Sequence, residues 1–158
     1  MSVTKSIFGA RAGEPVEMYT ISNGVITVEL LSFGATVKSI YTPDQQGVMG
    51  DITVSYDHFA AYEEGAYEGK TVGRYTNRIG GGRFEISGQE YQRTKNEKNR
   101  TNLHAAGEFS LSNWSCTILD DFSVKMTIES PDGTGGFPGN IKASVVFTIT
   151  NDNALELQ

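Results

Sequence analysis

The sequence has a single cysteine, Cys116, and only four prolines. One cysteine excludes an internal disulfide framework, and its alternation with Trp114 and Ile118 predicts a buried structural thiol on one face of a strand. Few prolines beside 18 glycines are typical of tight turns and not of a disordered linker. We therefore expect one folded domain over residues 1–158.

Long hydrophobic runs and clusters of basic residues are also missing. No segment approaches the length of a membrane span, and the first eight residues contain no long apolar run. A net charge of −6 without a basic cluster argues against a nucleic-acid partner, and an acidic surface repels anionic membranes. A reduced, cytoplasmic setting is the default expectation, and the acidic charge is compatible with a neutral ligand without singling one out.

Alternation of apolar and polar residues predicts an all-β chain. Period-2 patterns cover residues 26–31, 123–129 and 141–150, as expected for strands that are buried on one face. Ser87-Gly88 between two short alternating segments predicts a two-residue hairpin. Only residues 57–67 suggest a short helix, which Gly65 weakens. Many short antiparallel strands favour a sandwich of packed sheets.

The last residues, 155–158, begin an alternating strand and then stop. They fit a short terminal strand, or an incomplete domain whose next strands lie elsewhere. An unpaired apolar edge at Leu155 and Leu157 would also permit self-association.

Asn77 and Arg78 are the first candidates for binding chemistry. Arginine offers five N–H donors in a fixed fork and asparagine offers both a donor and an acceptor, which suits sugar hydroxyls. Gly73 and residues 80–82 would let a ligand approach the backbone closely. The alternative is an arginine–carboxylate pair that ties a loop to the fold, and the residues alone leave both hypotheses open.

His104, which precedes two alanines and a glycine, is the second candidate. It could donate a hydrogen bond to a sugar oxygen or exchange a proton near neutral pH. The alternative is a loop histidine bonded to the backbone, whereas His58 has only a structural or solvent-facing interpretation. Two histidines and one cysteine do not form a metal-ligand set by spacing, so no metal is expected. Phe137 and Tyr67 could line a pocket, although an aromatic residue in a β protein more often belongs to the core.

An ordered series of motifs identifies a family resemblance. The most specific block is Gly73-Arg74-Tyr75-Thr76-Asn77-Arg78-Ile79. The other elements, in order, are Phe33-Gly34-Ala35, Pro43-Asp44, Gly82-Arg83-Phe84, Gly88, Tyr91, Asn102-Leu103-His104, Trp114, Ser130-Pro131-Asp132-Gly133, Gly136-Phe137-Pro138-Gly139 and residues 148–155. Together they resemble the N-terminal half of the aldose 1-epimerase, or galactose mutarotase, family.

The resemblance implies an incomplete galactose mutarotase-like β-sandwich in which residues 1–158 form the N-terminal portion of a single domain. It implies a neutral hexose substrate whose α and β anomers interconvert by acid/base ring opening and closure, without a cofactor. Asn77 and Arg78 would bind the sugar, and His104 would be both a binding and a catalytic residue. A second histidine, an aspartate and the glutamate base belong to the family's C-terminal half, which further sequence or another chain would have to supply. This chain alone is therefore expected to be weakly active or inactive.

Two alternatives to this assignment remain. The chain could be a non-catalytic carbohydrate-binding or interaction remnant of the same fold, or a relative that acts on hexose 6-phosphates, for which Arg74, Arg78 and Arg83 would supply positive charge.

Two departures from the family pattern also stand out. Ala105-Ala106 replace the usual glycines after the histidine, which would crowd the pocket or restrict the loop, and Phe137 replaces a commoner tyrosine.

Overall fold

The first sheet of the sandwich is an antiparallel meander. A computed structural model describes residues 2–64 and 67–158. The sheet follows chain order: β1 (Thr4–Arg11), β2 (Glu14–Ser22), β3 (Thr27–Leu31), β4 (Thr36–Pro43) and β5 (Met49–Asp51). Consecutive strands joined by short turns pair antiparallel, as the alternating sequence predicts.

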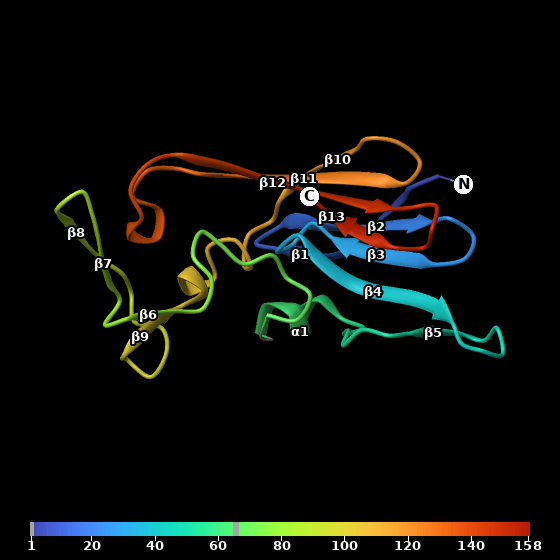
Figure 1. The fold of residues 1–158 in the computed structure, drawn as a ribbon, viewed down its shortest axis with the longest axis horizontal. Helices are drawn as coiled ribbons and strands as arrows, with labels where there is room; N and C mark the ends of the chain where they lie inside the picture. Colours follow the sequence, from blue (N-terminus) through green and yellow to red (C-terminus); the bar gives the residue numbers. More distant parts are fainter. Residues whose placement is uncertain (1, 65–66) are drawn as a thin grey trace.

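The second sheet lies over the first and closes the core (Figure 1). It also follows chain order: β10 (Ser115–Ile118), β11 (Ser123–Ser130), β12 (Ile141–Ile149) and β13 (Leu155–Leu157). The facing side chains form one apolar cluster made of Tyr19, Ile21, Ile26, Val28, Leu30, Ala35, Phe109, Trp114, Val124, Met126, Phe147 and Ile149. The sandwich and the all-β class are thus confirmed.

The opposite face of the first sheet is also covered, and the alternation did not predict this. Leu31, which alternates with the core-facing Leu30, is fully buried in a second cluster. Phe59 and Tyr62 of the short helix α1 (Phe59–Glu64) supply much of the cover. The helix falls within the predicted stretch 57–67, of which positions 65 and 66 lie outside the described residues.

Two small antiparallel ladders lie beyond the sandwich, at one end of the elongated molecule (Figure 1). β6 (Arg78–Gly80) pairs with β9 (Thr101–Leu103), and β7 (Arg83–Ile86) pairs with β8 (Gln89–Gln92). Ser87 and Gly88 connect the second pair with φ values of 52° and 80°. Positive φ at both turn residues is the geometry of the predicted two-residue hairpin.

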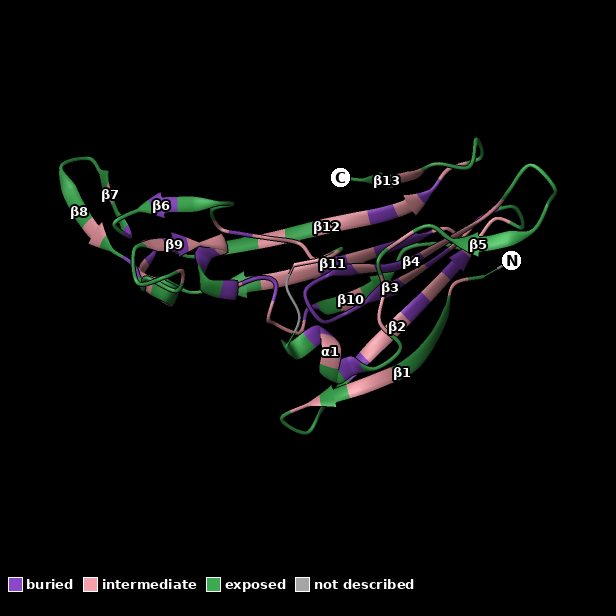
Figure 2. Ribbon diagram, turned by 90° about the horizontal axis from the view of Figure 1, so that it is seen from below, coloured by how far each residue is buried: buried purple, intermediate pink, exposed green. Residues whose placement is uncertain are grey.

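Burial along β12 falls as the strand leaves the sandwich, as Figure 2 shows. Phe147 and Ile149 are buried, whereas Ile141, predicted on the same face, is 41% exposed. The alternation is therefore confirmed, but the first sheet covers only the C-terminal part of this face.

Cys116 is half-buried against the main core, less completely than predicted. Desolvation by burial raises the pKa of its thiol to about 12, so the thiol stays protonated at neutral pH. Leu155 and Leu157 pair with β12 as the outermost strand of the second sheet, and Leu157 is exposed. In the described ranges, no helix is long and apolar enough to span a membrane.

Candidate functional site

The register of the β6–β9 ladder brings the candidate residues together. Arg78 lies opposite Leu103, so Asn77 and His104 are the next residues along the two strands. The His104 amide donates to the Asn77 carbonyl at 3.0 Å and extends the ladder by one bond. Asn77, Arg78 and His104 were predicted to share a site, and they are therefore neighbours although they come from two segments far apart in the sequence.

The His104 side chain has a defined orientation. Its Nδ1 accepts a hydrogen bond from the Asn77 amide at 3.1 Å, so the neutral imidazole carries its proton on Nε2. The ring of Tyr67 lies 4.4 Å from the imidazole, measured between centroids. Backbone bonding, the alternative interpretation of this histidine, is thus present, and no group of the described residues accepts a hydrogen bond from Nε2.

Arg78 forms a two-pronged ion pair with Glu97. Its Nε donates to Glu97 Oε2 at 2.7 Å and its Nη2 donates to Oε1 at 2.5 Å. Nη1 donates to Asn77 Oδ1 at 3.1 Å. The hydrogen bonds from Arg78, followed by the Thr101 hydroxyl, hold the pKa of Glu97 at about 2. The arginine–carboxylate pair considered as an alternative therefore exists, yet 54% of the Arg78 side chain remains exposed.

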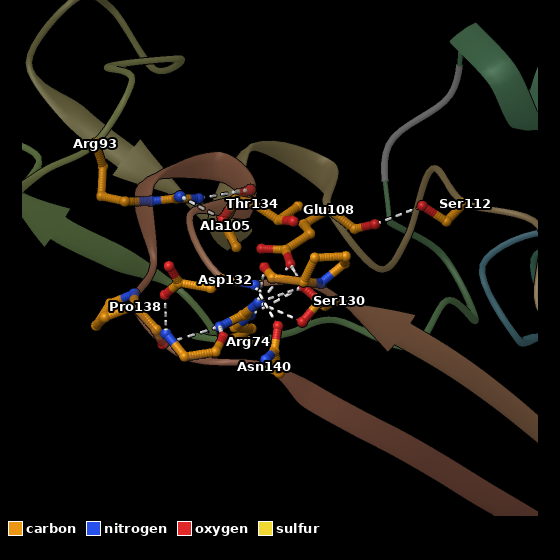
Figure 3. A network of polar contacts seen from close by, with 12 residues as sticks. Arg74, Arg93, Ala105, Glu108, Ser112, Ser130, Asp132, Thr134, Pro138 and Asn140 are labelled. Carbon is orange, nitrogen blue, oxygen red and sulfur yellow. Dashed lines mark hydrogen bonds and ion pairs between the residues drawn. The ribbon is translucent and has the colours of Figure 1, made fainter.

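Arg74, grouped with Arg78 and Arg83 in the phosphate hypothesis, has a different environment. Its side chain is only 6% exposed and faces the buried carboxylate of Glu108 at 3.2 Å. Its guanidinium also donates to Ser130 and to the carbonyls of Pro131, Pro138 and Gly139 (Figure 3). All of its donor nitrogens are engaged by protein groups, so Arg74 is a structural residue.

The turn after His104 has a backbone geometry that favours glycine. His104, Ala105 and Ala106 have φ values of 51°, 51° and 55°. The left-handed region costs a residue with a Cβ roughly 1–2 kcal/mol. The two alanines are therefore strained, and the expected restriction of this loop has a physical basis.

A cavity of about 470 Å³ adjoins Arg78, and neither Asn77 nor His104 is among the residues that line it. It is lined by Arg74, Tyr75, Arg78, Ile79, Gly80, Arg83, Phe84, Ile86 and Phe137. Phe137 lines this cavity and also belongs to a small buried cluster with Ile79 and Ala105, so both interpretations of this aromatic residue apply. Tyr67 instead contacts His104. His58 is exposed, consistent with its structural or solvent-facing interpretation. Among the described residues, no three His, Cys, Asp or Glu side chains are grouped to hold a metal.

Sequence reasoning missed two residues that support the site. The Asn96 side chain accepts from the Leu103 amide at 2.7 Å and donates to its carbonyl at 3.0 Å. Glu97 holds Arg78, as described above. Both lie in the loop between β8 and β9, where no motif or periodicity marks them.

Comparison with known proteins identifies a matching family. The family model for aldose 1-epimerase matches residues 17–158. A probable aldose 1-epimerase of Arthroderma benhamiae is 33% identical over 152 residues, and the human galactose mutarotase is 31% identical over 152 residues. These matches cover 92% and 94% of this chain.

Solved structures give the same fold. A GalM/aldose epimerase homologue from C. elegans superposes with a TM-score of 0.84 at 28% identity, covering 90% of this chain and 44% of that one. A galactose 1-epimerase from Lactobacillus acidophilus has a TM-score of 0.85 at 21% identity, covering 99% of this chain and 47% of that one. The chain thus spans less than half of each solved chain, as it does of the two curated relatives, where the share is 34% and 44%.

Replacing Arg74 and Arg78 separately by leucine is expected to affect the stability of the chain very differently. Arg74→Leu leaves the Glu108 carboxylate buried without its partner, and such a loss costs about 3–5 kcal/mol of unfolding free energy. Arg78→Leu removes a solvent-exposed pair and should leave the urea midpoint close to that of the parent chain. Equal midpoints for the two variants would contradict the structural role of Arg74.

The substitution Ala106→Gly is expected to stabilise the chain. It relieves the strain of the left-handed backbone, and this outweighs the flexibility that glycine adds to the unfolded state. The free energy of unfolding should therefore rise by about 0.5–1 kcal/mol. Ala60→Gly, at an exposed position in α1, is the matched control and should cost about 1 kcal/mol. Urea unfolding measures both changes, and destabilisation by Ala106→Gly would show that this backbone is not strained.

Proposed function

The chain belongs to the aldose 1-epimerase family, and on that premise we propose that Asn77, Arg78 and His104 form the sugar-binding part of an aldose 1-epimerase site. The substrates are neutral hexoses such as galactose and glucose, whose α and β anomers interconvert. The observation that carries the proposal is the adjacency of the three residues at the end of the β6–β9 ladder.

Each residue has a chemical task in this proposal. Arg78 donates hydrogen bonds to sugar oxygens, and Asn77 helps to hold its guanidinium. His104 donates from Nε2 to a ring or hydroxyl oxygen, where it stabilises the charge that develops as the ring opens. The fixed Nδ1 contact selects the tautomer that can make this donation.

We propose that this chain needs further groups to complete the reaction. The second histidine and the glutamate base implied by the family resemblance have no matching positions in residues 1–158. Further sequence or another chain would supply them, and the protein would work in the cytoplasm. A hexose 6-phosphate substrate is less favoured, because Arg74 has no donor left for a phosphate.

Sugar binding should be detectable by the chain alone. Titration of ¹⁵N-labelled chain with D-galactose is expected to shift the amide signals of Asn77, Arg78 and His104, and His104→Ala should weaken the binding. His58→Ala, which changes the exposed second histidine, is the matched control. Galactitol, which cannot form the ring, should bind more weakly. Absence of shifts at these amides, or no loss in His104→Ala, would contradict the proposed site.

Polarimetry of freshly dissolved α-D-galactose tests catalysis separately from binding. We expect the purified chain to change the mutarotation rate little above buffer, because proton removal from the C1 hydroxyl requires a positioned base. A clear enhancement that disappears in His104→Ala would contradict this expectation. His104 would then take a larger part in the proton transfers than is proposed here.

A further inference from the structure

Glu97 is held against β9, the strand that leads into His104. Its backbone forms an isolated bridge with Thr101, the first residue of β9. Its Oε2 accepts a hydrogen bond from the Thr101 hydroxyl at 2.6 Å. The carboxylate is therefore fixed to the same strand that leads into His104, and its side chain is only 22% exposed.

Arg78 is more exposed than its partner and carries a long, rotamer-rich side chain. Ordering such a side chain on binding costs affinity, roughly 0.5–1.5 kcal/mol in typical interfaces. Glu97 orders it in advance through two contacts, Nε to Oε2 at 2.7 Å and Nη2 to Oε1 at 2.5 Å. This side-on arrangement fixes the plane of the guanidinium.

The remaining donors define what the guanidinium can bind. Arginine has five N–H groups. Glu97 takes the one on Nε and one on Nη2, and Asn77 Oδ1 takes one on Nη1. Among the described residues, no group accepts from the remaining N–H on each terminal nitrogen. Two such donors suit two neighbouring oxygens of one ligand, such as vicinal hydroxyls of a hexose ring.

We propose that Glu97 is a positioning residue for sugar recognition, which orients Arg78 so that its two remaining terminal N–H groups bind neighbouring hydroxyl oxygens of the hexose. This inference rests on the proposed function and deepens it. Glu97 touches no reacting atom and acts through Arg78. Its ionised state is consistent with this role, because the bonds from Arg78 hold the pKa of the carboxyl at about 2.

The test compares Glu97→Gln with Glu90→Gln. Both remove one surface carboxylate, but Glu90 lies 3.9 Å from Arg83 and does not contact Arg78. We expect Glu97→Gln to weaken D-galactose binding by about 2- to 13-fold, the effect of releasing one rotamer-rich side chain. Glu90→Gln should bind as the parent does.

Two further readouts separate positioning from general damage. The Nε–H signal of Arg78, assigned by its loss in Arg78→Ala, should move in Glu97→Gln and stay in place in Glu90→Gln. In the Arg78→Ala background, adding Glu97→Gln should not weaken the residual binding further, because the carboxylate acts only through the arginine.

The outcomes distinguish this inference from the function on which it rests. Parent-like or tighter binding by Glu97→Gln overturns the positioning role, and tighter binding would mean that Glu97 occupies donors that the sugar needs. In either case the proposed sugar site stands. If the parent chain itself binds no galactose, the proposed function fails and this inference fails with it.

Discussion

One buried guanidinium, that of Arg74, holds together the part of the molecule that lies beyond the sandwich. It joins its own segment to Glu108, to the end of β11 at Ser130, and to the turn at Pro138 and Gly139. A buried charge is tolerated only when it is paired and its donors are satisfied. Here acceptor groups of five residues, Glu108, Ser130, Pro131, Pro138 and Gly139, satisfy the donors of Arg74. The long excursion of the chain between β5 and β10 is anchored to the second sheet by these contacts.

The candidate site depends on that anchor. A two-stranded ladder such as β6–β9 is marginally stable by itself in water. Arg74 fixes the residues that lead into β6, and Gly73 before it leaves room for the ring of Phe109, which an added Cβ would meet at 2.4 Å. The sandwich thus anchors Arg74, Arg74 fixes the segment that leads into the ladder, and the ladder positions Asn77 and His104.

The sequence predicted the sheets well because one-sided burial leaves a period of two in the residues. It also predicted the hairpin, since Gly88 adopts positive φ without steric cost and the two-residue turn has positive φ at both positions. It did not predict that Leu31 faces a second core, because the cover comes from α1, which lies 28 or more positions away. Alternation describes a strand, whereas the burial of its second face depends on tertiary packing.

For the site, motif resemblance identified Asn77, Arg78 and His104 as candidates, and the ladder places them side by side. The residues alone could not distinguish Arg74 from Arg78, since both occur in one short motif and differ only in what surrounds them. Their side chains are 6% and 54% exposed. Glu97 was missed for a related reason: its partnership with Arg78 arises from the register of β6 against β9, and no local pattern encodes that register.

The strained turn after His104 shows how the site keeps its geometry. Three successive residues in the left-handed region are held only where the surroundings determine the backbone strongly. Here the Ala105 carbonyl accepts from Arg93 Nη2 at 3.1 Å, and Arg93 in turn lies 3.8 Å above the ring of Phe137. Phe137 belongs to the turn that Arg74 holds through the neighbouring Pro138 carbonyl. The buried arginines therefore fix the backbone behind the imidazole, while Glu97 fixes the exposed arginine beside it. Hydrogen-bond donors that are held in place before a ligand arrives lose less entropy on binding. A rigid backbone and fixed side-chain contacts therefore favour ligand binding by the flexible polar side chains of this site.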